Sequence, residues 1–440
     1  MHSRTTTHRE SPLPLPRALS QALEHQVLDI DGDIKAIAQV PGSDQWLVAI
    51  DSGYGFCVAR LHADLTLDDS FGLPDRGYFF DTFDTASFAF TAVNQLAWVG
   101  DKVLVVGATC DFDVDRIALA RYHADGRPDL SFNGDGKHIL ELPHSRRRPR
   151  KQRSGTTHSA IFTPQTPVVL ADGGVVLFFL ETCEQHPEGR AFLVRLDASG
   201  ALDTGFNQQG FAQVQFEGRT VVPRGVVRQG NDLLLYGATC PDDEGATQGL
   251  IARFDANGHR DMTFNGTGFI VIGDACTRTV LSQVSVDEHH EIYAAGTFGS
   301  ELLVTRRRAD GSPHADFNTG VPLLVTLPFE VTGVKAVARQ GDALLLAATA
   351  GASEYKGTLV RLAAEGALDT AFADGAGYLM AEHESEYLAL GLERDGTIIA
   401  AGYLYQQGYY AWVRRFDCNA LRPVQRPFGK ERQRYRQAVG

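Results

Sequence analysis

The chain has 440 residues, of which 43% are apolar and 22% are charged, and its formal net charge is −13 with histidine counted as neutral. This composition is typical of a folded globular protein and excludes a collagen, a disulfide-dense scaffold and a wholly disordered chain. No run approaches the roughly 18 apolar residues that a membrane-spanning helix needs. The acidic balance argues against non-specific binding of the whole body to nucleic acid or to anionic membranes.

The N-terminal segment, residues 1–26, is predicted to be a tail that is mostly disordered or forms a short helix at 17–24. It lacks the apolar stretch of a classical signal peptide, so we expect a cytoplasmic protein. Export by a route that needs no signal peptide is the alternative. The next residues, Val27 to Ile30, have the composition of a strand.

From residue 34 to about 420 the sequence is a sevenfold internal repeat with a mean step of about 59 residues. Each copy carries an arginine after a short apolar strand: Arg60, Arg121, Arg195, Arg253, Arg306, Arg361 and Arg415. In most copies a glycine lies five residues after this arginine, an aspartate eight residues after it and a phenylalanine eleven residues after it. Some copies depart from this pattern: Leu65 and Ala420 replace the glycine, His314 and Pro423 replace the aspartate, and Arg426 replaces the phenylalanine.

Each copy also contains four short runs of β-forming residues separated by turn residues. In the sixth copy these runs lie at 334–337, 343–348, 358–361 and 377–380. A unit of this size cannot bury both of its faces alone, so neighbouring units must pack against each other. The sequence therefore predicts an all-β fold, a seven-bladed β-propeller of four-stranded antiparallel blades over residues 27–422. One domain replaces the roughly three that the chain length alone suggests.

The ends of the repeat predict how the ring closes. The last copy has no good fourth strand after Phe416, whereas Val27 to Ile30 precede the first copy at the offset that residues 268–272 have before the fifth. We therefore expect the N-terminal strand to pair into the last blade, which removes an exposed sheet edge.

The stretch from Ala252 to Gly268 resembles the delta-60 repeat family, a bacterial β-propeller-like repeat family, and the resemblance recurs in all seven copies. It implies repeated β-blades and no catalytic residues. The residue types support a structural interpretation: glycine permits a positive φ in a turn, and aspartate caps the next turn. The phenylalanine is expected to pack between blades, and the arginine and aspartate to form a hydrogen-bonded ion pair. A single catalytic centre does not need its residues in five to seven copies.

Possible ligand groups are few. Two acidic triplets have the spacing that opens a calcium loop: Asp29, Asp31 and Asp33, and Asp111, Asp113 and Asp115. Both lack other ligands of that loop, so solvated acidic loops are the favoured interpretation. Three cysteines follow the second strand of successive copies and are predicted to be small buried side chains: Cys110, Cys183 and Cys240. No metal, nucleotide or hydrolase motif is present, and we expect no cofactor.

Positive charge is concentrated in two segments. One is an insertion at 144–160, between the second and third copies, with Arg146, Arg147, Arg148, Arg150, Lys151 and Arg153. The other is the C-terminal tail at 423–440. Such runs are usually solvated and disordered. The functional alternative is an electrostatic arm for a protein or another acidic macromolecule.

Three classes of function follow from the sequence. The first is a monomeric, non-enzymatic scaffold or binding module for a protein or other macromolecular partner. The second is a propeller enzyme of the hydrolase, lyase or lactonase type, with polar residues in a central channel. Its candidates come from predicted first strands: Lys35, Asn94, Arg224 and Lys335. The third is a secreted or surface adhesion protein that binds glycans or calcium, although only three tryptophans are available for sugar stacking.

Overall fold

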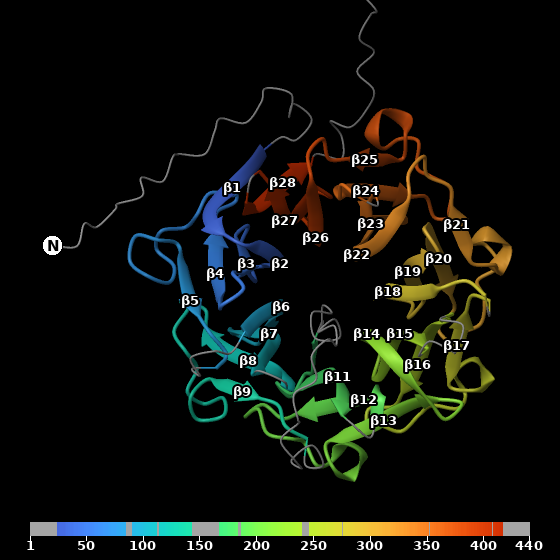
Figure 1. Cartoon of the computed structure of the whole chain (residues 1–440), viewed down its shortest axis with the longest axis horizontal. Coiled ribbons are helices and arrows are strands. Elements are labelled where there is room, and N and C mark those ends of the chain that lie inside the picture. The colour runs from blue at the N-terminus through green and yellow to red at the C-terminus, as the bar shows by residue number, and fades with distance from the viewer. Residues whose placement is uncertain are drawn as a thin grey trace, which may run out of the picture.

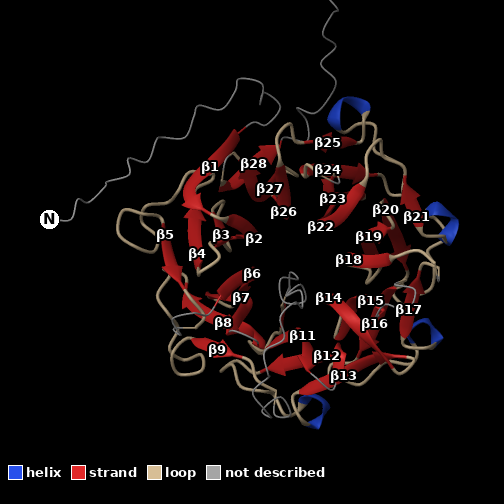
Figure 2. Cartoon of the chain, in the orientation of Figure 1, coloured by secondary structure: helices blue, strands red, loops and turns tan. Residues whose placement is uncertain are grey.

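The computed structural model describes residues 24–84, 90–111, 114–142, 167–183, 186–239, 246–274, 276–351, 353–406 and 408–416. These ranges contain 28 β-strands and four one-turn 3-10 helices (Figures 1 and 2). No helix in them is both long and apolar enough to cross a bilayer.

The strands follow one another along the chain in groups of four. The first groups are β2 to β5 (Asp33–Gln39, Trp46–Asp51, Phe56–Leu61, Tyr78–Asp81), β6 to β9 (Phe90–Val99, Lys102–Asp111, Val114–His123, Lys137–Ile139) and β10 to β13 (Val168–Val169, Val175–Cys183, His186–Leu196, Phe211–Phe216). The next groups are β14 to β17 (Arg219–Gln229, Asp232–Thr239, Gly249–Phe254, Phe269–Ile272), β18 to β21 (Thr279–Val286, Ile292–Phe298, Glu301–Arg307, Leu323–Val325) and β22 to β25 (Val331–Gln340, Ala343–Ala350, Lys356–Leu362, Tyr378–Met380). The last group is β26 to β28 (Ser385–Leu392, Ile398–Tyr405, Tyr409–Phe416) together with β1 (Glu24–Asp31).

Hydrogen bonding assembles these strands into five four-stranded sheets and one eight-stranded sheet. The eight-stranded sheet runs from β10 to β17, because Phe216 at the end of β13 pairs with Arg219 at the start of β14 across a tight turn. Figure 1 shows the sheets arranged around a common centre, with β2, β6, β14, β18, β22 and β26 nearest to it. The 3-10 helices η1 to η4 lie at the periphery (Figure 2). Their bounds are Phe206–Gln208, Phe264–Gly266, Asn318–Gly320 and Ala373–Gly375.

The N-terminal strand pairs with the last strand of the chain. Residues of β1 lie antiparallel to β28, with Glu24 opposite Arg415 and Val27 opposite Trp412. The strand begins at Glu24, three residues before the expected start of the repeat domain at residue 27. The pairing extends towards the chain terminus because Glu24, His25 and Gln26 continue the ladder on β28. The rest of the expected tail and helix, the insertion at 144–160 and the tail at 423–440 lie outside the described residues.

The core lies between neighbouring sheets. Each apolar cluster combines side chains of two successive strand groups, as where Phe56 and Phe79 of the first group contact Tyr122 of the second. The same kind of cluster joins Leu28, Ile399 and Val413 of the last sheet to the first sheet. Burial of these interfaces is the main source of stability, since one sheet alone leaves both of its faces in water.

The repeated arginine and aspartate form the expected ion pair in five copies, with Nε–carboxylate distances of 2.6 to 2.8 Å: Arg60–Asp68, Arg121–Asp129, Arg195–Asp203, Arg253–Asp261 and Arg361–Asp369. In the fifth copy, where His314 replaces the aspartate, Glu291 takes over and lies 2.6 Å from Arg306 and 3.2 Å from His314. The pair ties the third strand to the turn that follows it, as the sequence predicted.

The repeated phenylalanine packs between sheets, also as predicted. Phe132 lies under the guanidinium of Arg121 at 4.6 Å and against Gly200 of the next strand group. A Cβ on Gly200 would come within 2.7 Å of the Phe132 ring, and the φ of this glycine is +91°. Glycine is therefore required here for both its conformation and its lack of a side chain.

Candidate functional site

A β-bulge recurs in the innermost strand of six groups. In β2, β6, β14, β18, β22 and β26 a residue at an equivalent position is left out of the pairing with the second strand, and β22 has a second such residue, Thr332. The residues at the equivalent position are Lys35, Asn94, Arg224, Ser282, Lys335 and Leu388. A bulge bends the strand and turns one side chain out of the regular alternation. The bulge residues, which differ in type from group to group, therefore belong to the strands nearest the centre of the assembly (Figure 1).

The four channel candidates named from the sequence all occupy this bulge position. Lys35 lies 2.9 Å from Asp33, and Lys335 lies 3.1 Å from Glu386. Asn94 is buried. Burial, with a smaller contribution from the neighbouring Arg278, lowers the pKa of the Arg224 guanidinium. The candidates come from four different sheets. Lys35 pairs with a carboxylate of its own strand, and Lys335 pairs with a carboxylate of the neighbouring sheet.

Glu386 on β26 is the centre of a polar cluster at the junction of two sheets. Its carboxylate accepts a hydrogen bond of 2.5 Å from the Thr349 hydroxyl and forms an ion pair with Lys335. Thr349 and Lys335 both belong to the sheet of β22 to β25. It also accepts a hydrogen bond from the hydroxyl of Tyr403 on β27. The side chain of Glu386 is only 15% exposed, so these partners compensate for its loss of water.

The Tyr403 hydroxyl stays protonated in this environment. Burial raises its pKa, and the carboxylates of Glu386 and Asp33 raise it further because they disfavour a phenolate. Tyr403 therefore acts as a neutral hydrogen-bond donor. A general base would need the opposite shift, towards the working pH.

Asp33 extends the polar cluster into the first sheet. It is close enough to Tyr403 to affect its pKa and forms the ion pair with Lys35. Asp51, at the end of β3, adds another carboxylate, which accepts a hydrogen bond from the Gly53 amide. Burial raises the pKa of Asp51. Polar side chains from three sheets thus meet near one end of β26 to β28.

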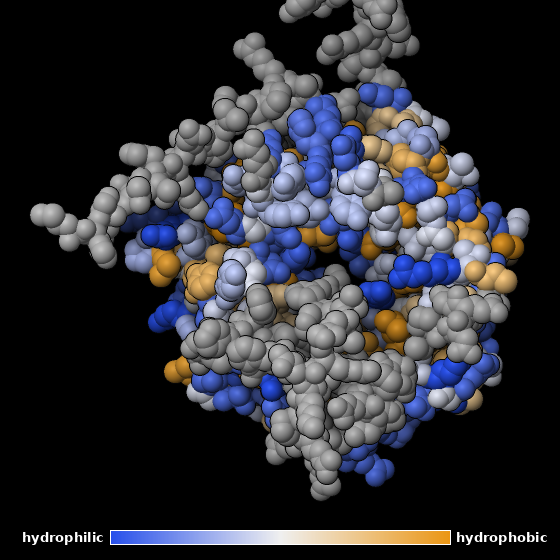
Figure 3. Space-filling view, in the orientation of Figure 1, coloured by the Kyte–Doolittle hydropathy of each residue, from blue (hydrophilic) through white to orange (hydrophobic). Residues whose placement is uncertain are grey.

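Two exposed tyrosines stand beside this cluster. Tyr405 and Tyr409 face each other across the turn between β27 and β28, with ring centroids 5.2 Å apart. Tyr409 also contacts Tyr403, at 5.1 Å in an edge-to-face arrangement. Tyr405 is 40% exposed and Tyr409 is 54% exposed. Figure 3 shows a largely hydrophilic described surface over β26 to β28 on the face in view.

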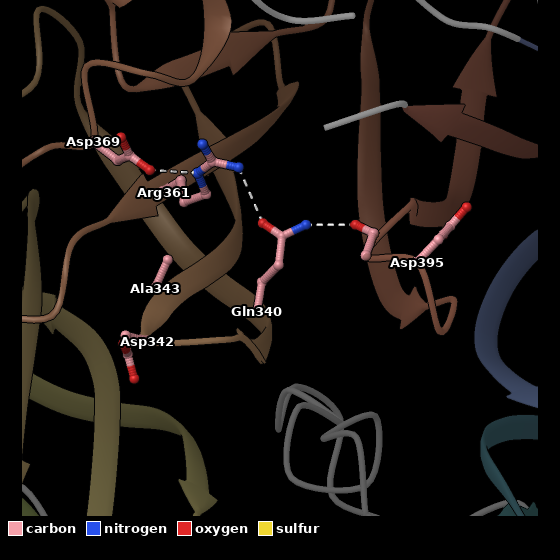
Figure 4. A pocket seen from close by; sticks show the side chains of 7 residues that line it. Gln340, Asp342, Ala343, Arg361, Asp369 and Asp395 are labelled. Carbon is pink, nitrogen blue, oxygen red and sulfur yellow. Dashed lines mark hydrogen bonds and ion pairs between the residues drawn. The ribbon is translucent and has the colours of Figure 1, made fainter. Parts of the chain in front are cut away.

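A recess of about 410 Å³ lies at the opposite ends of these strands, between the last two sheets (Figure 4). Its side chains form a chain of contacts in which Asp369 binds Arg361, and Arg361 donates to Gln340. Gln340 in turn donates to the Gly396 carbonyl of the last sheet. The ion pair in this recess ties the third strand to its turn, and Gln340 links it to the last sheet, while Asp342 and Asp395 also line the recess.

Part of the possible metal ligands can be placed. Among the described residues, no three histidine, cysteine, aspartate or glutamate side chains are arranged to hold a metal ion. Of the first acidic triplet, Asp33 is bound to Lys35. The side chains of the second triplet and of Cys110, Cys183 and Cys240 lie outside the described residues.

Sequence reasoning did not identify Ser282, Leu388, Glu386 or Tyr403. The repeat could have identified Ser282 and Leu388 from their position. The bulge residue lies three residues before a first-strand residue that pairs with the second strand directly opposite the repeated arginine. In the first group, for example, Lys35 precedes Ala38, which pairs with Leu47 and through it with Arg60. Glu386 and Tyr403 carry no such signal, since they belong to one copy only.

Comparison with known proteins identifies a propeller repeat. The family model described as "Domain of unknown function (DUF5122) beta-propeller" matches residues 101–132. This match supports a β-propeller repeat family and does not single out the delta-60 repeat family. No curated protein matches the chain.

Solved structures with similar coverage include Drosophila Semaphorin 1a, extracellular domains 1-2, at 10% identity and a TM-score of 0.47, covering 90% of this chain and 88% of that one. The Dos1 propeller has 10% identity and a TM-score of 0.43, with coverages of 90% and 95%. The polysaccharide lyase Uly1 has 9% identity and a TM-score of 0.44, with coverages of 89% and 91%.

Proposed function

We propose that the chain is a closed seven-bladed β-propeller that acts as a non-enzymatic binding scaffold for a protein or other macromolecular partner. The observation that carries this proposal is the division between repeated and non-repeated residues. The repeated arginines, aspartates, glycines and phenylalanines are engaged in contacts within and between sheets. The exposed tyrosines and the cluster around Glu386 occur once, at one end of the last sheet. Recognition on such a frame falls to the residues that differ between copies.

The proposed ring of seven counts β10 to β13 and β14 to β17 as two blades joined by a short turn. Its closure is supported by the β1–β28 ladder and by the burial of Leu28, which is 2% exposed in a cluster with the first sheet. Leu28→Ala is expected to reduce the free energy of unfolding by about 2–5 kcal/mol, because it leaves a cavity at this junction. Chemical denaturation measures the loss, and Val321→Ala, at a residue 58% exposed, is the control. An unchanged stability of Leu28→Ala would contradict the closure.

The chemistry of the polar cluster around Glu386 favours a binding role over the enzyme alternative. Glu386 is held by Lys335 and Thr349, and the raised pKa of Tyr403 keeps its hydroxyl protonated. Groups fixed in this way offer a partner a hydrogen-bond donor and a rigid polar surface.

The experiment is affinity capture with the purified full-length chain, followed by titration of the purified captured protein by calorimetry. Saturable binding of that protein supports the scaffold role. Absence of saturable binding, or turnover of a small-molecule substrate abolished by Glu386→Gln, contradicts it. Glu301→Gln, at an exposed residue on another sheet, is the matched control.

The basic insertion is a second proposed contact for an acidic macromolecule. The proposal rests on the charge of its arginines and lysine alone. Simultaneous replacement of Arg146, Arg147, Arg148 and Arg150 by alanine should abolish salt-sensitive capture of an acidic partner. Capture that is equally strong with this variant, at low and high salt, would remove the insertion from the proposed interface.

A further inference from the structure

The turn between β27 and β28 carries two partly exposed aromatic rings. The rings of Tyr405 and Tyr409 lie 5.2 Å apart at a tilt of 55°, and the two residues are 40% and 54% exposed. Aromatic faces attract cations because the ring quadrupole is negative above its plane. Elsewhere the chain uses this interaction repeatedly, as where Arg414 lies 4.9 Å from the Trp412 ring and Arg253 lies 4.5 Å from Phe264.

Carboxylates flank this turn on two sides. On one side, the backbone amide of Tyr405 donates to the carbonyl of Glu384, within the acidic segment Glu382 to Glu386. On the other side, Asp31 lies opposite Tyr410 in the β1–β28 ladder, and Gly32 donates to the Tyr409 carbonyl. The turn therefore stands between two acidic stretches that come from different ends of the chain.

Two lysines near this turn are paired with carboxylates: Lys35 lies 2.9 Å from Asp33, and Lys335 lies 3.1 Å from Glu386. Asp31, Glu382 and Glu384 add three carboxylates. Against them stands a further cation, Lys356, whose neighbour Gly357 accepts a backbone hydrogen bond from Ala381 beside the acidic segment. The local balance is negative, and it is superimposed on an acidic chain with a formal charge of −13. A cationic group is therefore attracted both by the aromatic rings and by the negative charge of the carboxylates.

We propose that the Tyr405–Tyr409 turn binds an arginine side chain of a protein partner. A guanidinium is planar, so it can stack on a tyrosine ring while its edge donates hydrogen bonds to a neighbouring carboxylate. An ammonium group lacks this planar fork. The inference rests on the proposed binding role and names the chemistry that the partner presents to it.

The test is calorimetric titration of the full-length chain at physiological salt with a short arginine-rich peptide. The same peptide with citrulline at each arginine position is the uncharged counterpart. The arginine peptide is expected to bind saturably, and the citrulline peptide is expected to bind at least about 10-fold more weakly. Equal binding of the two peptides, or no saturable binding of the arginine peptide, overturns the proposal.

Variants locate the contact. The double variant Tyr405→Ala/Tyr409→Ala should weaken binding by about 10-fold, whereas Tyr405→Phe/Tyr409→Phe, which keeps both rings, should bind within about 3-fold of the unaltered chain. Leu130→Ala removes an exposed apolar side chain, 65% exposed, from the second strand group and should leave binding unchanged. A loss of equal size in Leu130→Ala would show that the effect is not specific to this turn and would overturn the assignment.

The outcome is separable from that of the proposed function. If the Tyr405→Ala/Tyr409→Ala variant still binds the captured partner as tightly as the unaltered chain, the scaffold role stands and the arginine contact is lost. Circular dichroism of each variant verifies that the fold is retained, which is needed because Tyr409 packs against the buried Tyr403.

Discussion

Arg415, in the last strand, donates a hydrogen bond to the backbone carbonyl of Ala63 in the first sheet, 352 residues earlier in the chain. The same relationship joins successive copies elsewhere: Arg121 donates to the Ala198 carbonyl at 2.6 Å, and Arg253 donates to the Ala309 carbonyl at 2.7 Å. In each case the acceptor lies three residues after the arginine of the next copy. The contact between the last and first sheets therefore repeats one that neighbouring sheets make.

Loss of the Arg415 guanidinium should weaken this junction. Arg415→Met keeps the aliphatic part of the side chain but removes the hydrogen bond to Ala63 and the ion pair with Glu393, which is 2.8 Å away. We expect the free energy of unfolding to fall by about 1–3 kcal/mol, the range for hydrogen bonds to charged groups. Urea denaturation measures it. Arg127→Met, at a side chain 79% exposed, should change stability by less than about 0.5 kcal/mol. Equal effects of the two substitutions would argue against the contact.

The repeated aspartate should make stability depend on pH in the acid range. Burial alone would raise the pKa of Asp129, but hydrogen bonds from Lys102, Ser131 and Arg121 outweigh burial and hold the pKa well below its usual range. Because the folded-state pKa lies below the unfolded-state value, the stabilisation is fully present above about pH 4 and is lost as the pH falls through the folded-state value.

Asp129→Asn should therefore be destabilising by about 3–5 kcal/mol at neutral pH, since the buried partners lose their counter-charge. The deficit relative to the unaltered chain should shrink as the pH is lowered below about 4. Urea unfolding across this range is the measurement, with Asp342→Asn, at a side chain 96% exposed, as control. A deficit that is constant with pH would contradict the assigned charge interaction.

The arginine–aspartate pair was predictable because both partners lie in one copy at a fixed separation of eight residues. The arginine–carbonyl contact was not, because Arg121 and Ala198 are 77 residues apart and meet only when two sheets pack in register. The replacement of an aspartate by Glu291 in the fifth copy was likewise hidden, since Glu291 precedes the second strand of its group and not the turn after the third.

The central bulges were only partly predictable. Polarity in a first strand was enough to select Lys35, Asn94, Arg224 and Lys335, but a bulge interrupts the alternation on which strand patterns depend. Ser282 and Leu388 occupy the same register without a distinctive side chain. The cluster of Glu386 with Tyr403 and Asp33 forms between strands from both ends of the chain, so no local sequence pattern predicts it.

Close packing of phenylalanine on glycine should make one turn glycine far less replaceable than another. Gly200→Ala places a Cβ within 2.7 Å of Phe132 at a φ of +91°, whereas Gly134→Ala has a similar φ of +86° and no atom within 4 Å. Both variants carry the conformational cost of a left-handed residue, and Gly200→Ala adds steric overlap of about 1–3 kcal/mol. Thermal unfolding of the two proteins isolates this difference. If both lose the same stability, the ring contact between sheets does not matter.

The buried Tyr403 should contribute to stability at neutral pH and should lose this contribution in alkaline solution. The folded-state pKa of Tyr403 lies above its unfolded-state value, so its contribution is fully present below about pH 10 and is lost as the pH rises further. Tyr403→Phe should be less stable than the unaltered chain at neutral pH, and the gap should close above about pH 10. Denaturation at stepwise higher pH tests this, with Tyr355→Phe, at an exposed residue, as control. A gap that widens with pH would show that the hydroxyl is not held in its protonated form.

The pairing of β1 with β28 also determines how the molecule responds to mechanical force. Glu24 lies opposite Arg415, so the two chain ends leave adjacent strands at the same end of one sheet. A pulling force applied through the termini acts on this first residue pair and opens the ladder one hydrogen bond at a time, which is an unzipping and not a shearing geometry. A tether attached to both termini would therefore detach the N-terminal strand at low force before any other sheet is loaded.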